Sequence, residues 1–162
     1  MVIVLMGVAG AGKSTVGARL AAVLGWPFLD ADALHPPPNV DKMRRGIPLT
    51  DADRYPWLAH VRKRIEDYVR AGQSAVVACS ALRGGYRDRL RVDPTVRFVF
   101  LKGDPALLLD RVNRRIDHFL KAPLLESQLA SLEEPIDAVT IDAALPVDEV
   151  VQRIRGSLDI GR

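Results

Sequence analysis

The feature that most constrains this chain is a glycine-rich stretch at residues 7–14, with the sequence GVAGAGKS. It matches the phosphate-binding pattern of a glycine, four residues, and then Gly-Lys followed by Ser or Thr. The apolar run of residues 2–6 precedes it with strand character, and residues 13–24 follow with apolar side chains at helical spacing. A strand, this loop and a helix in succession predict a phosphate-binding loop.

The residue types of the loop fit the chemistry of a polyanion. Backbone N–H groups must point inward, and Gly7, Gly10 and Gly12 let the backbone turn and approach phosphate without a Cβ clash. Lys13 is expected to contact the β- and γ-phosphates of a nucleotide, and the Ser14 hydroxyl is expected to bind Mg²⁺. The helix that follows adds free N–H groups and its dipole.

Length and composition exclude several classes of protein. A chain of 162 residues with 48% hydrophobic and 27% charged residues is typical of one globular domain. Its arginines are scattered and its aromatic content is 6%, which disfavours a nucleic-acid surface. No apolar run is long enough to span a bilayer, so we expect no membrane association. The single cysteine, Cys79, fits a reducing compartment and is expected to be a small core residue.

Strand and helix patterns alternate along the chain. Strands are expected at residues 2–6, 26–29, 75–79, 96–101 and 138–141. Helices are expected at 13–24, from a cap at Asn39 to 45, at 50–71, in a short segment after the Gly84-Gly85 pair, at 104–115, 123–133 and 146–158. This alternation predicts a parallel sheet covered on both faces, with the phosphate-binding loop at its carboxyl edge.

Two carboxylates follow the second expected strand. If the backbone continues extended, Asp30 and Asp32 share one face and lie about 7 Å apart. They could then serve Mg²⁺ through water on one side and an acceptor hydroxyl on the other. The alternative is a pair of exposed turn aspartates, and position alone does not decide between the two.

Two arginines, Arg111 and Arg115, are spaced four apart and are therefore expected on one helix face, just before an irregular loop at 116–122. Cations there could close over the phosphates and stabilise charge during transfer. A solvated basic face is the alternative for such a pair.

Beyond the loop, the chain resembles the small gluconate kinases of the phosphate-loop kinase superfamily, which are relatives of shikimate kinase. The resemblance covers nearly the whole chain and rests on MGVAGAGKST, LDADALHPPPNVDKM, GIPLTDADRYPWL, CSALRGGYRDRLR, FVFLKGD and RVNRRIDHFLKAPLLESQLASLEEP. It implies a three-layer αβα sandwich with a five-stranded parallel sheet, a single domain over residues 1–162 and a mobile lid at about 112–125. It also implies a cytoplasmic enzyme, often dimeric, that uses ATP and Mg²⁺ to convert D-gluconate to 6-phosphogluconate.

The resemblance also assigns roles by position. It implies that Asp32 orients the hydroxyl and accepts its proton, that Asp30 is a water-mediated partner of magnesium, and that Arg115 lies near the phosphates as a catalytic group. Arg111 is expected against the adenine ring. Nucleotide contacts are expected from Gly7, Val8, Ala9, Gly10, Ala11, Gly12, Lys13, Ser14 and Thr15, and contacts to gluconate from Asp32, His35, Arg54, Tyr86 and Arg87.

The chain departs from the family pattern in the lid segment. Asp117 stands where the family usually has glycine before the histidine, here His118, and Leu120 replaces an aromatic residue. Two other functions remain open at this stage: a shikimate or other small-metabolite kinase of the same fold, and a nucleotide-dependent switch without an acceptor. Acceptor preference separates the first from gluconate kinase, and partner-dependent hydrolysis would mark the second.

Overall fold

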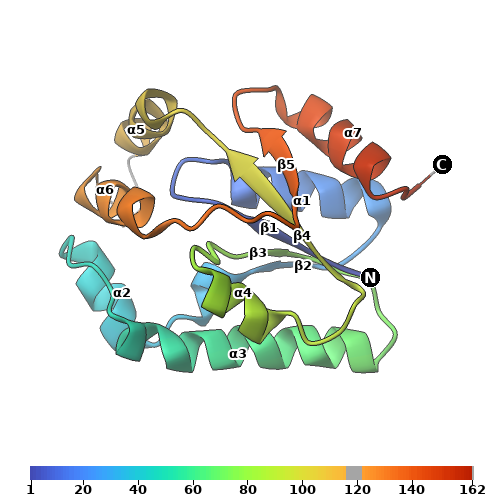
Figure 1. Ribbon diagram of the computed structural model, residues 1–162, viewed down its shortest axis with the longest axis horizontal. Helices are drawn as coiled ribbons and strands as arrows, with labels where there is room; N and C mark the ends of the chain where they lie inside the picture. Colours follow the sequence, from blue (N-terminus) through green and yellow to red (C-terminus); the bar gives the residue numbers. More distant parts are fainter. Residues whose placement is uncertain (116–121, 162) are drawn as a thin grey trace.

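The computed structural model describes residues 1–115 and 122–161 (Figure 1). Five strands alternate with helices along the chain. The elements are β1 (Val2–Met6), α1 (Lys13–Leu24), β2 (Phe28–Asp30), the 3₁₀ turn η1 (Ala31–Leu34), α2 (Pro37–Arg44), α3 (Asp51–Arg70), β3 (Ala75–Ala78), α4 (Gly84–Leu90), β4 (Val96–Lys102), α5 (Pro105–Arg114), α6 (Ala122–Ser131), β5 (Val139–Asp142) and α7 (Val147–Ser157). Across the described residues, none of the helices combines the length and apolar character that crossing a bilayer would require.

The five strands form one parallel sheet in the order β2-β3-β1-β4-β5. Helices α3 and α4 lie on one face of the sheet, and α1 and α7 lie on the other (Figure 1). The fold class predicted from the sequence is therefore confirmed. β1 is central, so the loop that follows it emerges in the middle of the carboxyl edge, where open α/β sheets bind ligands.

Two hydrophobic cores hold the layers together, because side chains of each strand alternate between the faces. Ile3 and Leu5 of β1 pack with α1, α6 and α7, whereas Val2, Val4 and Met6 pack with α3 and α4. All five of these side chains are fully buried. A strand buried on both faces reads as a continuous apolar run, which is why β1 and β3 could be recognised in the sequence.

Two short helices begin earlier than the sequence patterns predict. α2 starts at Pro37, and Asn39 is its third residue rather than its cap. Proline is tolerated there because the first N–H groups of a helix have no partner within it. α4 starts at Gly84, so the glycine pair is its first turn; the free N–H of Gly84 donates to the Glu133 carboxylate.

The helix α5 ends one residue earlier than predicted. Arg115 has extended backbone angles at its C-terminal cap, so the expectation that Arg111 and Arg115 share a helix face is wrong. The proposed lid at 112–125 includes the last turn of α5 and the start of α6, and residues 116–121, with Asp117, His118 and Leu120, lie outside the described residues. The lid stays a prediction.

The start of α3 is fixed by a capping box. The Thr50 hydroxyl accepts from the N–H of Asp53 at 3.1 Å, and the Asp53 carboxylate accepts from the N–H of Thr50 at 2.9 Å. Lys42 of α2 donates to the same carboxylate at 2.7 Å. The cap therefore joins α2 to α3 and sets the position of the first turns of α3, which carry Arg54 and Trp57.

Removing the hydroxyl of this cap should lower stability. Thr50→Ala is expected to reduce the free energy of unfolding by about 1 kcal/mol, the usual cost of losing an N-cap side chain. Urea denaturation of the wild type and the variant measures this difference. Thr50→Ser keeps the hydroxyl and is the control, with stability close to wild type. Equal losses in the two variants would show that the methyl group, rather than the cap, carries the effect.

Candidate active site

The phosphate-binding loop has the backbone that its glycines predict. Gly7, Gly10 and Gly12 have φ of 147°, 82° and 92°, which side chains other than glycine rarely adopt. A Cβ on Gly7 would lie 2.8 Å from the carbonyl oxygen of Leu101, and one on Gly10 would lie 2.8 Å from that of Leu108. The loop is therefore packed tightly on β4 and α5, and only glycine fits at these positions.

The loop leaves the start of α1 ready for an anion. Three residues of the loop itself are buried: Val8, Ala9 and Ala11. By contrast, Ser14 and Thr15 are exposed on the first turn of α1. Within the described part of the chain, no side chain caps this helix start. The first N–H groups of α1 and the helix dipole are therefore available at this end of the helix, an arrangement that favours phosphate.

A lysine and two aspartates meet beside the loop. The Lys13 ammonium donates to the carbonyl of Val8 at 3.1 Å, across the loop. The Ser14 hydroxyl donates to Oδ2 of Asp30 at 2.6 Å, and Oδ1 of Asp30 accepts from the N–H of Asp32 at 3.0 Å. Asp30 thus caps the turn η1, and the expected extended path from Asp30 to Asp32 is wrong. The turn brings Asp32 into the same cavity as Lys13.

Burial opposes the charges of both groups. It lowers the pKa of Lys13 and raises the pKa of Asp32, while the attraction between these two side chains acts against both shifts. Arg115 adds a positive charge that also acts on both of their pKa values. A site with a half-buried lysine, a half-buried carboxylate and a nearby arginine is a typical place for proton transfer and anion stabilisation.

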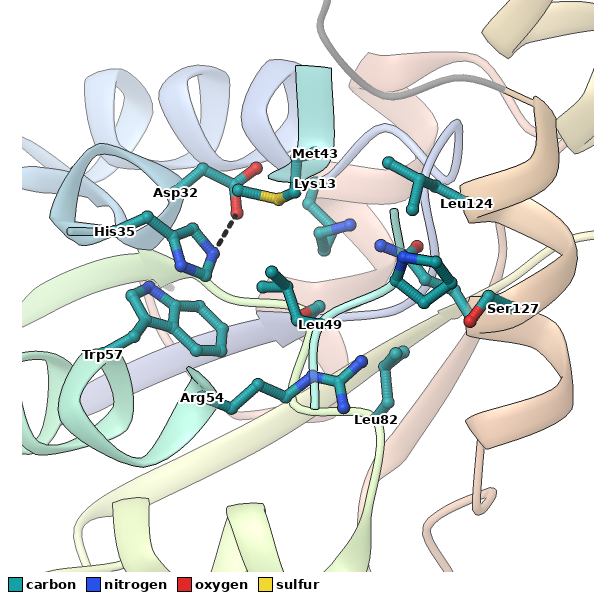
Figure 2. A pocket seen from close by; sticks show the side chains of 13 residues that line it. Lys13, Asp32, His35, Met43, Leu49, Arg54, Trp57, Leu82, Leu124 and Ser127 are labelled. Carbon is teal, nitrogen blue, oxygen red and sulfur yellow. Dashed lines mark ion pairs between the residues drawn. The ribbon is translucent and has the colours of Figure 1, made fainter. Parts of the chain in front are cut away.

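The cavity continues from the loop to the end of α2 and the start of α3 (Figure 2). Asp32 and His35 lie on one side, Arg54 lies below them, and Leu124 and Ser127 of α6 close the opposite side. The remaining lining residues are Met43, Pro48, Leu49, Trp57, Ser80, Leu82 and Gln128. A cavity with a carboxylate, an imidazole and a guanidinium among apolar walls suits a small polar molecule with a negative charge.

The His35 ring is held on an aromatic base. It stacks on Trp57 with 4.2 Å between ring centroids and 13° between planes, and Trp57 donates to the carbonyl of Ala31 at 2.7 Å. Burial, with a smaller contribution from the positive charge of Arg54, lowers the pKa of His35 to about 4. His35 is therefore neutral near pH 7.

This shift makes stability depend on pH. The unfolded chain binds a proton at His35 below about pH 6.5, whereas the folded chain binds it only below about pH 4. The free energy of unfolding should therefore fall as pH decreases from 6.5 to 4, by at most about 3 kcal/mol from this group. Denaturant titrations across this range measure the slope. His35→Gln should flatten it, and His60→Gln, which removes an exposed histidine of α3, is the matched control variant.

Tyr86 and Arg87, predicted to contact the acceptor, do not line this cavity. The Tyr86 hydroxyl bonds the carboxylate of Asp51 and accepts from Arg54 at 3.3 Å. Arg87 is buried, and its guanidinium donates to the carbonyls of Ala81 and Glu133, both at 2.8 Å. In this conformation Tyr86 supports Arg54, and Arg87 joins α4 to the segment after α6; direct contact with a substrate stays a prediction for both.

A second cavity lies on the other side of the loop. It is lined by Gly10, Gly12, Thr15, the arginines of the α5 end and the segment between β5 and α7. Arg111 donates to the carbonyl of Gly10 at 3.2 Å and to that of Ala143 at 2.8 Å. Arg111 and Arg115 therefore share this cavity although they do not share a helix face. The contact of Arg111 with an adenine ring stays a prediction.

Gln128 of α6 is a site residue that the sequence analysis missed. Its side-chain oxygen accepts from the N–H of Ala9 in the phosphate-binding loop at 2.7 Å, and its side chain also lines the first cavity. The signal was weak, since Gln128 follows Glu126 and Ser127 on α6 and looks in the sequence like another ordinary surface position. Ser80 and Trp57 line the cavity as well, and only the packing of β3 and α3 places them there.

Comparison with known proteins places this geometry in a family. A family model described as "AAA domain" matches residues 2–135. A gluconokinase of Gluconobacter oxydans is 49% identical over 155 residues, which cover 95% of this chain and 82% of the relative. The unliganded crystal structure of a sugar kinase from Janibacter has a TM-score of 0.91 at 41% identity, with 99% of this chain and 95% of that chain covered. A gluconokinase structure from Sinorhizobium meliloti has a TM-score of 0.83 at 43% identity, with 97% and 94% covered.

Proposed function

The chain belongs to the gluconokinase family, and on that premise we propose that it transfers the γ-phosphoryl group of ATP to D-gluconate, forming ADP and 6-phospho-D-gluconate. The observation that carries the proposal is the pairing of Lys13 with Asp32 in one cavity beside the phosphate-binding loop. In this proposal Lys13 contacts the γ-phosphoryl group that is transferred, and Asp32 contacts the hydroxyl group that attacks it. The match covers 82% of one gluconokinase relative and 94% of the other, which supports the choice of acceptor.

On the nucleotide side, the chain supplies binding and charge. The loop from Gly7 to Gly12 shapes the place for the phosphates, and the first N–H groups of α1 bind them there. Arg111 lines the second cavity, which would hold the adenine base. Arg115 lines the same cavity, and its positive charge acts on Lys13. Phosphoryl transfer passes through a loose transition state, so Lys13 and Arg115 stabilise it mainly through electrostatics.

Ser14 and Asp30 fit a magnesium ion. Their oxygens lie 2.6 Å apart, both are oxygen ligands of the kind that Mg²⁺ prefers, and Asp30 is the last residue of β2. When bound, the ion would supply positive charge that neutralises part of the charge of the phosphates. Ser14 would be its protein ligand, and Asp30 would contact it through water.

On the acceptor side, Asp32 orients the hydroxyl and receives its proton. The hydroxyl oxygen forms a bond to the γ-phosphorus while the bond from that phosphorus to the β,γ-bridging oxygen breaks, and ADP leaves with the electron pair. His35 and Arg54 line the same cavity and supply polar contacts for a polyol carboxylate. Tyr86 would contribute through its contact with Arg54, and Arg87 by holding the segment at Ala81 and Glu133 in place.

We also propose that the reaction takes place in the cytoplasm, where ATP is available and the buried thiol of Cys79 stays reduced. D-gluconate is its small-molecule partner. A homodimer, without nucleic-acid or membrane partners, is the assembly proposed from the family resemblance.

An assay of ADP release tests the function. The full chain with Mg-ATP is offered D-gluconate, related sugar acids, shikimate and nucleoside monophosphates, and products are identified. We expect turnover with D-gluconate and formation of 6-phospho-D-gluconate. Turnover with shikimate or a nucleotide instead would preserve the nucleotide site and overturn the acceptor. ATP binding without turnover of any acceptor would favour a nucleotide-dependent switch.

A further inference from the structure

Asn39 is a buried amide whose nitrogen faces two acceptors. Asn39 is only 3% exposed. Its Nδ2 lies 2.9 Å from the carbonyl oxygen of Asp53 and 3.2 Å from Nδ1 of His35. A backbone carbonyl can only accept a hydrogen bond, so the nitrogen of the amide, not its oxygen, must face Asp53. The second hydrogen of the same nitrogen is therefore directed at Nδ1 of His35.

The fold holds this amide in one orientation. The carbonyl of Asp53 lies in the first turn of α3, where the capping box with Thr50 and the bond from Lys42 fix the residue. Asn39 itself lies in the first turn of α2. The donor toward His35 is thus set by the junction of two helices rather than by a free rotation of the amide.

An amide donor at Nδ1 selects one tautomer of the imidazole. Nδ1 must carry the lone pair, so the proton of the neutral ring resides on Nε2. A doubly protonated ring would place an N–H against a nitrogen that cannot accept it. The side chain of His35 is 4% exposed and stacked on Trp57, so the ring cannot easily turn over to exchange its nitrogens.

The protonated nitrogen faces the catalytic carboxylate. Nε2 of His35 lies 4.0 Å from Oδ1 of Asp32, as the dashed line in Figure 2 marks. This separation is too long for a direct hydrogen bond. An oxygen at about 2.8 Å from each atom would fit between them with an angle near 90°, accepting from Nε2–H and donating to Oδ1. A hydroxyl group can do both at once.

We propose that Asn39 is a positioning residue that fixes His35 as a hydrogen-bond donor, through Nε2–H, to the acceptor hydroxyl whose proton Asp32 receives. His35 keeps its proton throughout the reaction and directs the hydroxyl by binding its lone pair. The inference rests on the proposed function, since it needs a hydroxyl acceptor in the cavity beside Asp32. The contact with Asp53 alone would make Asn39 a link between α2 and α3, whereas the contact with His35 gives it a role in the reaction.

The tautomer can be measured directly on the full chain. The sequence has three histidines, so two-bond ¹H–¹⁵N spectra of the imidazole rings are simple, and the signals absent in His35→Gln identify His35. At pH 7 we expect a protonated Nε2 and an unprotonated Nδ1, with the Nε2 signal shifting when D-gluconate is added. A proton on Nδ1, or a mixture of tautomers, would overturn the proposal, and so would an Nε2 signal that saturating D-gluconate leaves unchanged.

A double-mutant cycle separates this role from a structural one. Asn39→Leu should lower kcat/KM for D-gluconate by about fivefold, roughly the effect of one neutral hydrogen bond, and leave the KM of Mg-ATP unchanged. Glutamine at position 35 can donate from its own amide and has no tautomer to fix. In the His35→Gln background, Asn39→Leu should therefore change kcat/KM by less than twofold. Equal losses in both backgrounds would reduce Asn39 to a structural contact.

The two proposals fail in different ways. If the wild type does not phosphorylate D-gluconate, the proposed function fails, while the tautomer is still read from the spectra and the cycle is run with whichever acceptor turns over. If D-gluconate is phosphorylated but the ring carries its proton on Nδ1, only the role of Asn39 is overturned.

Discussion

Lys13→Ala should reduce turnover by about 10³-fold or more, the scale found when a group aimed at transition-state charge is removed. The ammonium lies at the start of α1 and donates across the loop to the carbonyl of Val8 at 3.1 Å. Burial lowers the pKa of Lys13, and a triphosphate beside it would favour its charged form. Steady-state kinetics with saturating Mg-ATP and D-gluconate measure the loss.

A matched variant separates charge from loop shape. Lys13→Gln removes the charge but keeps a long side chain that can donate to the carbonyl of Val8. We expect this variant to be nearly as impaired as Lys13→Ala, with both unfolding like the wild type in thermal melts. Turnover within tenfold of the wild type in either variant would remove Lys13 from the catalytic role.

Asp32→Asn should lower turnover by about 10²- to 10⁴-fold, because the amide fills the same space but cannot receive the hydroxyl proton. ATP affinity should change by less than threefold, since the loop and the Ser14–Asp30 pair remain in place. Turnover assays and a separate ATP titration measure the two quantities. The informative result is a loss of turnover without a matching loss of ATP affinity.

Asp30→Asn is the matched comparison two residues away. Asp30 accepts from Ser14, so its loss should weaken Mg-ATP binding more than it slows the chemical step. If Asp32→Asn instead weakened only ATP binding, Asp32 would be a magnesium partner and the acceptor would need another base.

Much of the fold follows from local signals. The continuous apolar runs of β1 and β3 mark strands buried on both faces, and Asp104-Pro105 marks the start of α5. The helix starts that were misplaced, at Pro37 and Gly84, involve residues that usually end helices. Their first-turn N–H groups are missing or are bound by a distant carboxylate, so local rules alone misplace the boundary.

In the candidate site as well, some residues could be placed from the sequence and others could not. Family motifs placed Asp32, His35 and Arg54 together, and the structure brings all three into one cavity with Lys13. The same motifs placed Arg87 on the substrate, but its guanidinium donates to two backbone carbonyls. A motif reports that a residue is needed in the family, and it does not report which atoms that residue touches.

By itself the sequence determined the phosphate-binding loop, the parallel sheet and the kinase family, because these depend on steric limits, hydrophobic periodicity and local motif spacing. Only the tertiary structure decided that Gln128 binds the loop, that Arg115 leaves the helix of Arg111, and that Asn39 faces His35. The contacts of Gln128 and Asn39 join polar groups on different elements. A buried polar group takes whichever partner the packed elements bring within hydrogen-bond distance, and that choice is made only when the layers assemble.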